Sequence, residues 1–371
     1  MKRILQLKKA LRAALFVLLL NVVGMTKANP VDMSTAREVA MKFMNSNTNT
    51  PLRSIDDLQL VTTYNINRGD AAFHIFNTPN GFVIVAADDC AIPILGYSNE
   101  GQFDMENIPI QLQSYLQGFV EQLQYGIENH IEADEQTAKQ WELVRTIGRL
   151  TNNRSDVGVE PLLTTRWGQR YPYNMFVPSG CPTGCTATAM AQIMKYWEWP
   201  VQGTGEHSYE WNGQTLSANF GETTYDWDNM LDSYHIQTTQ EQDEAVATLM
   251  WHCGVSVDMD YSPNGSGAVL NPGTLINYFN YSDEMNKLSL NNCSVSYWKA
   301  RLKDCLDLGR PVFYTGFSSS YNNGHAFVCD GFDTNDMFHF NWGWSGSGDG
   351  YFSIGALNVI SYDFNYYNSA M

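Results

Sequence analysis

The first third of the chain alternates between helical and strand-like patterns of apolar residues. Residues 31–45 have the spacing of a helix, for which Ser34 is a plausible N-cap. Between Ile108 and about His130, apolar residues recur at i, i+3, i+4, i+7 and i+8, which predicts a helix with one buried face. The two helices enclose a region that is rich in β-branched and aromatic residues.

That region predicts strands. Residues 58–66 form one apolar run, and residues 71–89 form a second that is interrupted by Pro79-Asn80-Gly81, a strong hairpin turn sequence. We therefore expect a compact α+β unit of its own. The following stretch, residues 131–160, is polar and predicts an exposed linker in which Arg149 and Arg154 are accessible cleavage points.

A second apolar region begins after residue 160 with a cysteine-rich loop. Cys185 ends the sequence Pro-Ser-Gly-Cys-Pro-Thr-Gly-Cys and precedes a helical pattern that Pro200 terminates. Backbone N–H groups and the positive dipole end at a helix N-terminus lower a thiol pKa, so Cys185 is a candidate nucleophile. The alternatives are a disulfide with Cys181, a metal site, or an inert buried thiol at the start of a core helix.

The candidate base comes from a predicted hairpin. Residues 325–332 and 337–344 read as strands, joined by a turn in which Phe332 pairs with Met337. A Gly-rich loop and another strand follow. The pairing places every second residue of each strand on the same face of the sheet.

This register puts Trp342 on the same face as His325 and diagonal to it, whereas Asn341 points the other way. His325 is then the partner that takes the proton of Cys185, and Trp342 orients its ring. A one-residue bulge would exchange Trp342 for Asn341. The plainer alternatives are a hydrogen-bonded strand histidine and a tryptophan pair that only packs in the core.

Composition and charge narrow the classes of function. The chain has 371 residues, 44% of them hydrophobic and 13% aromatic, which indicates a folded protein of about two domains. The net charge of −17 argues against binding to nucleic acid or to anionic membranes. Seven cysteines are too few for a disulfide scaffold, and their odd number leaves at least one thiol unpaired in a monomer.

The N-terminus reads as a secretion signal. Residues 1–28 carry six basic residues and no acid, with an apolar stretch from Ala13 to Met25. Small residues at Thr26 and Ala28 fit cleavage after Ala28. The apolar stretch is shorter than the roughly 20 residues that span a bilayer. We therefore expect a secreted protein, extracellular or on the cell surface, with no membrane span.

Three ordered motifs together resemble one family. Cys185 and the helix after it, Gly324-His325-Ala-Phe-Val, and Asn341-Trp-Gly-Trp344 are similar to the streptopain family of secreted bacterial cysteine proteases, including relatives from oral anaerobes. The resemblance spans about residues 165–360. It implies a papain-like α+β fold with a helical lobe and an antiparallel sheet lobe, preceded by an inhibitory prodomain. It also suggests a part in virulence.

The resemblance assigns roles by position. It implies that Cys185 is the nucleophile, His325 the general acid–base, Trp342 the residue that orients His325, and Gln169 a donor to the oxyanion. The loop at residues 262–268 matches a segment that lines the substrate cleft. The expected substrate-binding residues are Ser266, Gly267, Gly324 and Trp344.

These observations predict a secreted zymogen with a signal peptide at 1–28, a prodomain at 29–152 and a catalytic domain at 153–371. The last residues fall within what resembles the family's final strand, so the alternatives are a protein shorter than its relatives and a catalytic domain truncated at its C-terminus. The predicted activity is an endopeptidase that cleaves extracellular proteins, is held inactive by its own prodomain, and needs no metal or organic cofactor. The alternatives are a cysteine-dependent amidase or acyltransferase with a non-protein acceptor, and an inactive binding module.

Overall fold

The computed structural model describes residues 29–48, 50–152, 157–235, 237–316, 324–357 and 368–371. The expected signal peptide and Arg154 lie outside these residues. The helices are α2 (Met33–Asn47), α3 (Ile110–Glu128), α4 (Glu135–Ile147), α5 (Cys185–Trp197), α6 (Gln240–Ser256), α7 (Pro272–Phe279) and α8 (Val295–Asp307).

The strands form one long sheet and one small hairpin. In the long sheet the order is β1 (Gln59–Asn65), β2 (Ala71–Asn77), β3 (Phe82–Ala86), β4 (Ile94–Ser98), β11 (Gly350–Phe352), β10 (Phe338–Asn341), β9 (His325–Phe332), β8 (Val312–Gly316), β12 (Ser369–Ala370) and β7 (Leu288–Ser289). The hairpin pairs β5 (Glu206–Trp211) with β6 (Gln214–Asn219).

The first helix and hairpin largely follow the sequence prediction. The turn before Gly81 is confirmed, because Asn77 pairs with Phe82 in the β2–β3 hairpin. The N-cap prediction for α2 is wrong. Asp32, not Ser34, caps the helix, and its carboxylate accepts the Thr35 N–H at 2.8 Å.

The prediction of an exposed linker at 131–160 is wrong where α4 forms. Asp134 caps this helix, and Gly148 ends it with a φ of +70°. Trp141 and Val144 are buried, and the Trp141 indole N–H donates to the carbonyl of Ala91 at 2.8 Å. A helix with so few apolar residues still folds because those few residues share one face.

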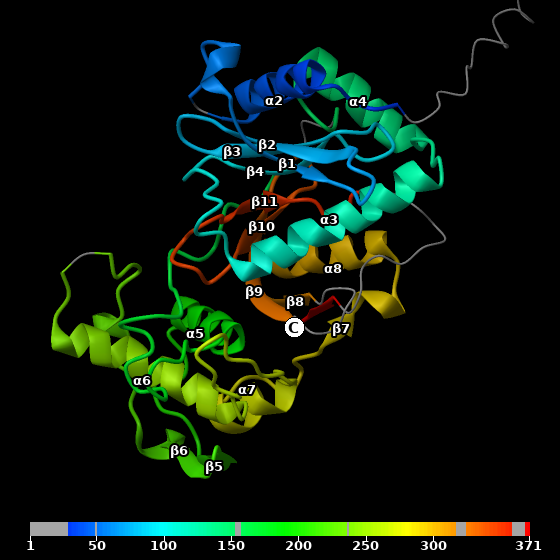
Figure 1. Cartoon of the computed structure of the whole chain (residues 1–371). Coiled ribbons are helices and arrows are strands. Elements are labelled where there is room, and N and C mark those ends of the chain that lie inside the picture. Colours follow the sequence, from blue (N-terminus) through cyan, green and yellow to red (C-terminus); the bar gives the residue numbers. More distant parts are fainter. Residues whose placement is uncertain (1–28, 49, 153–156, 236, 317–323, 358–367) are drawn as a thin grey trace, which may run out of the picture.

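The hydrophobic core of the first unit is continuous with that of the C-terminal strands. Strand β4 pairs with β11, so that Tyr97 lies opposite Tyr351 and Gly96 opposite Phe352. A Cβ on Gly96 would come within 2.6 Å of the Phe352 ring, and this close approach favours glycine there. The N-terminal strands and the C-terminal strands therefore make one continuous sheet (Figure 1).

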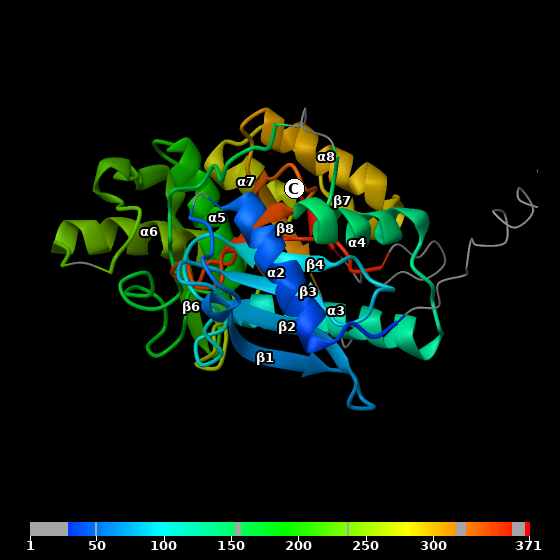
Figure 2. The same cartoon turned by 90° about the horizontal axis from the view of Figure 1, so that it is seen from above.

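Helix α3 spans that junction and lies along the sheet in both views (Figures 1 and 2). Phe119 packs against Phe73 on β2, while Tyr115 contacts Phe340 and Phe352 on the C-terminal strands. One hydrophobic cluster accordingly contains buried residues from both units. The expected α+β unit thus packs directly on the C-terminal strands.

A second hydrophobic cluster covers the opposite face of β9. Helices α5 and α6 pack on each other, and α5 rests on β9 through Ala326 and Val328. This helical part projects from one end of the sheet (Figure 1). No helix within the described ranges is long and apolar enough to cross a membrane.

The predicted pairing of Phe332 with Met337 is wrong by one residue. Phe332 pairs with Phe338, because Asp333 accepts the Met337 N–H at 2.9 Å and draws that residue into the turn. A bulge follows His339, and beyond it the pairing has the predicted register. The residues nearest the candidate base thus have the expected alignment.

Candidate active site

Cys185 is the first residue of α5, directly after Gly184. Gly184 has a φ of +90°, and a Cβ there would come within 3.0 Å of the Ser266 carbonyl oxygen, so glycine suits this position. Cys185 is partly exposed, and its Sγ accepts a hydrogen bond from the Ala326 N–H at 3.4 Å. The thiol therefore lies beside the start of β9, where His325 is found.

Burial disfavours the charged forms of both Cys185 and His325. It raises the pKa of the Cys185 thiol, although hydrogen bonds from Ala326 and Thr186 act in the opposite direction. Burial also lowers the pKa of His325 to about 4, and in the described part of the chain its Nε2 has no hydrogen-bond partner. The expected lowering of the thiol pKa by the helix end is wrong here, because desolvation outweighs it.

Gln169 lies on a loop that is hydrogen-bonded to the segment leading to Cys185, residues 178–185. Its carbonyl accepts the Thr183 N–H at 3.0 Å, and Arg170 donates to the Gly180 carbonyl at 3.1 Å. The Gln169 side chain is buried. The structure thus brings Gln169 close to the stretch that ends at Cys185, and its role toward an oxyanion stays a prediction.

The two candidates for orienting His325 point to opposite faces of the sheet. The ring centroid of Trp342 lies 4.6 Å from that of Phe327 and 5.6 Å from that of Tyr115 in α3. No ring contact with His325 is found for Trp342 in the ranges that the structure describes. Asn341 faces α5 instead. The part that Trp342 plays toward His325 stays a prediction.

The loop predicted to line the cleft runs beside the start of α5. Ser266 is buried, and its hydroxyl donates to the Pro182 carbonyl at 2.7 Å. Thr186 donates to the Ala268 carbonyl at 2.8 Å. Gly267, which lies between these anchors, has open space where a Cβ would be. The loop therefore borders the thiol.

The two remaining predicted binding residues flank the site from the sheet side. Gly324 is exposed directly before His325. Trp344 is half-buried in the loop after β10, and that loop is tied to the Gln169 segment because the Ser345 N–H donates to the Trp167 carbonyl at 2.9 Å. Contact of either residue with substrate stays a prediction.

Sequence analysis missed a buried pair of amides behind the site. Gln192 of α5 donates from Nε2 to the Asn341 Oδ1 at 3.0 Å, and both side chains are buried. Gln192 gave no signal, because on a helical wheel it lies opposite the apolar face formed by Met190, Ile193, Met194 and Trp197. Nothing in the sequence marked Asn341 as its partner.

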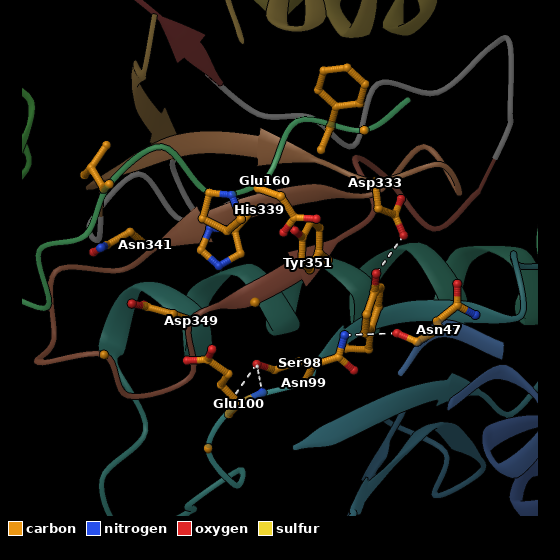
Figure 3. Close-up of a pocket in the computed structure, with 18 of the residues that line it drawn as sticks. Asn47, Ser98, Asn99, Glu100, Glu160, Asp333, His339, Asn341, Asp349 and Tyr351 are labelled. Carbon is orange, nitrogen blue, oxygen red and sulfur yellow. Dashed lines mark hydrogen bonds between the residues drawn. The ribbon is translucent and has the colours of Figure 1, made fainter. Parts of the chain in front are cut away.

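A cavity of about 870 Å³ is lined by residues of both the first unit and the C-terminal strands (Figure 3). His339 points into it and forms a 2.6 Å ion pair with Asp330, and burial raises the pKa of Asp349 to about 7. Tyr97 of the first unit donates to Asp333 across its far end at 2.7 Å. None of the four predicted catalytic residues lines this cavity. Within the described ranges, no group of three or more His, Cys, Asp or Glu residues could hold a metal ion.

Comparison with known proteins gives two family matches. Residues 167–352 match the Peptidase C10 family, and residues 28–123 match the Spi protease inhibitor family. The chain is 30% identical to streptopain of Streptococcus pyogenes over 92% of this chain and 91% of that protein. It is 32% identical to the thiol protease/hemagglutinin PrtT of Porphyromonas gingivalis, but spans only 40% of that protein's length.

Two solved structures from Prevotella intermedia are similar. A prointerpain A fragment has a TM-score of 0.71 and 32% identity, with 84% of this chain and 96% of that chain covered. Active interpain A, a cysteine protease, has a TM-score of 0.52 and 39% identity, with 57% of this chain and 93% of that chain covered.

Proposed function

The chain belongs to the Peptidase C10 family and is a cysteine protease, and on this premise we propose that Cys185 is its nucleophile and His325 its general acid–base. The observation that carries the proposal is the 3.4 Å hydrogen bond from the Ala326 N–H to the Cys185 Sγ. It places the thiol at the N-terminus of α5 against the residue that follows His325.

The proposed reaction is acyl transfer from a peptide bond to Cys185. The thiolate attacks the scissile carbonyl, and the oxyanion is stabilised by the Gln169 side chain and the Cys185 N–H. His325 then protonates the leaving amine, and water hydrolyses the thioester with His325 as the base. The burial of Gln169 beside the segment 178–185 supports its part in this scheme.

We propose that residues 29–152 act as an inhibitory prodomain and that 153–371 form the enzyme. The match to the Spi protease inhibitor family and the strand pairing of β4 with β11 support this division of roles. Burial shifts the pKa of Cys185 upward and that of His325 downward, and both shifts fit an inactive precursor, since a thiolate–imidazolium pair is the reactive form of such a dyad.

We infer from residues 1–28 that the protein is secreted. We propose that its substrates are extracellular proteins and that it contributes to virulence. For the cleft, we propose that Ser266, Gly267, Gly324 and Trp344 bind the substrate chain. The hydrogen bonds that hold the 262–268 loop against α5 support the first two assignments.

The test is hydrolysis of casein by Cys185→Ala and His325→Ala, with Cys181→Ala as the matched control. We expect both site variants to lose at least about a thousandfold in kcat/KM, because each removes a group that takes part in bond cleavage. Cys181 is a buried neighbour of the site with no role in the reaction, so Cys181→Ala keeps its activity. Casein hydrolysis by Cys185→Ala at the wild-type rate would rule out the proposal.

A further inference from the structure

Three segments of the chain meet at two buried amide side chains. Gln192 Oε1 accepts the Thr165 hydroxyl at 3.0 Å and the Trp167 N–H at 3.3 Å. Its Nε2 donates to Asn341 Oδ1 at 3.0 Å. Asn341 Oδ1 also accepts the Gly343 N–H at 3.0 Å, and its Nδ2 donates to the Thr165 carbonyl at 2.9 Å.

Backbone groups fix the orientation of both amides. The Trp167 N–H can only donate, so it requires the oxygen of Gln192 on its side. The Thr165 carbonyl can only accept, so it requires the nitrogen of Asn341. With both orientations fixed, the Gln192 nitrogen meets the Asn341 oxygen, and flipping either amide would break contacts on two segments.

Each segment leads directly to a residue of the proposed mechanism. Gln192 lies about two helical turns after Cys185 on α5. Trp167 precedes Gln169 by two residues, and Asn341 is the residue before Trp342. The amide pair thus connects helix α5, the loop that carries Gln169, and the end of β10.

We propose that Gln192 and Asn341 are positioning residues for the peptidase reaction, and that their mutual hydrogen bond aligns the Cys185 helix with the Gln169 loop and the Trp342 loop. This inference rests on the proposed function. Neither amide touches the Cys185 thiol in the described structure, so both act through the segments they join. The role of Asn341 is therefore distinct from orienting His325.

The physical basis is the rigidity of a satisfied buried network. Loss of one amide leaves the donors and acceptors on the other segments unpaired away from water, and those segments shift to recover partners. A displacement of about 1 Å in an active site can slow the reaction about a hundredfold. The binding of substrate in the cleft depends on other residues and changes less.

The experiment compares Gln192→Met, Asn341→Leu and the double variant with the wild type after processing of the full chain is complete. Active sites are titrated with iodoacetamide, and kcat and KM for a casein-derived peptide are expressed per titrated site. Tyr225→Phe is the matched control, because it removes a buried 2.9 Å hydrogen bond to His252 that lies outside the three segments.

We expect each single variant to lower kcat per titrated site by about tenfold to a hundredfold, with KM within about threefold of the wild type. The loss in the double variant is smaller than the product of the two single losses, because the hydrogen bond between the two amides is lost in all three. Tyr225→Phe keeps the wild-type kcat. Unchanged kcat per site in both single variants, or losses that multiply in the double variant, would overturn the inference.

Gln192→Glu serves where the larger changes prevent folding, as followed by circular dichroism. The carboxylic acid that it introduces can donate to Asn341 only while protonated, so activity falls as pH rises through the pKa of that acid. This adds an ionisation to the pH profile that the wild type lacks, and its absence contradicts the inference. If iodoacetamide does not inactivate the wild type, the proposed function itself is contradicted. If it does inactivate the wild type, a negative result with the amide variants contradicts only the positioning role of Gln192 and Asn341.

Discussion

At the residue scale, burial decides the charge of the key side chains. Cys185 and His325 sit at the junction of two lobes, and desolvation moves the pKa of each toward its neutral form. His252 on α6 is affected in the same way and donates to or accepts from the Tyr225 hydroxyl at 2.9 Å. Protonation of these two histidines opposes folding.

His252 therefore makes the fold sensitive to acid. Its pKa is lowered to about 4 from 6.5, so the unfolded chain binds this proton between those values and the folded chain does not. The contribution of neutral His252 to the free energy of unfolding is complete above about pH 6.5, and it is lost as the pH drops toward 4. His252→Gln should reduce the loss over this window by on the order of 3 kcal/mol.

Urea unfolding of Cys185→Ala precursors at pH 7, 5.5 and 4.5 measures this effect. His235→Gln, which removes an exposed histidine, is the control. Equal pH slopes for His252→Gln and His235→Gln would show that His252 is not responsible.

Part of the site could be predicted residue by residue. Cys185 was identifiable because its glycines, helix start and apolar helix face are adjacent in sequence, and His325 because it opens an apolar strand of a predicted hairpin. The Gln192–Asn341 bond joins residues that are far apart in the chain, and no local pattern reveals such a pair. The thiol pKa was predicted in the wrong direction because sequence shows the helix end but not the burial around it.

At the element scale, α4 shows that a few buried residues on one face are enough to hold a helix against the rest of the protein. Only a few of its residues are buried, and polar composition alone predicted a linker. Trp141 is the largest of these buried side chains and donates its indole N–H to the Ala91 carbonyl, while the Arg145 guanidinium lies 4.9 Å above its ring.

Trp141→Ala should therefore destabilise the first unit by about 3–5 kcal/mol, the usual range for a buried tryptophan. Urea unfolding of the full precursor in a Cys185→Ala background measures this loss. Arg145→Ala, which removes the cation above the ring and leaves the core intact, is expected to cost less than about 1 kcal/mol. Similar losses for both variants would contradict the assigned packing role of Trp141.

Helix α3 is the element that holds the first unit on the sheet. Tyr115 contacts the rings of Phe327, Phe340, Trp342 and Phe352, and its hydroxyl donates to the Ser353 carbonyl at 2.7 Å. This one side chain thus bridges the predicted prodomain and the aromatic cluster under the candidate site.

Tyr115→Ala should loosen that hold and accelerate removal of the first unit several-fold, as followed by gel electrophoresis of the precursor over time. Tyr115→Phe keeps the ring contacts and loses only the bond to Ser353, worth about 1 kcal/mol, so it should process at close to the wild-type rate. Slower processing of Tyr115→Ala than of Tyr115→Phe would argue against α3 as the restraint.

At the scale of the whole molecule, the precursor is built around one sheet rather than two separate ones. Local patterns predicted the helices α3 and α5 and the β2–β3 hairpin, because each depends on residues close in sequence. The β4–β11 pairing was not predictable, since it joins edges from opposite ends of the chain and no turn connects them. Processing must therefore separate paired strands as well as cut the chain.

The central claim is that Cys185 and His325 form a peptidase that removes its own N-terminal unit. The most direct measurement is N-terminal sequencing of the wild-type chain and of Cys185→Ala, each expressed and purified in the same way. The account predicts a new wild-type N-terminus within residues 148–160, and a Cys185→Ala chain that retains the unit containing α2, α3 and α4. The same cut in both chains, without any added protease, would contradict it.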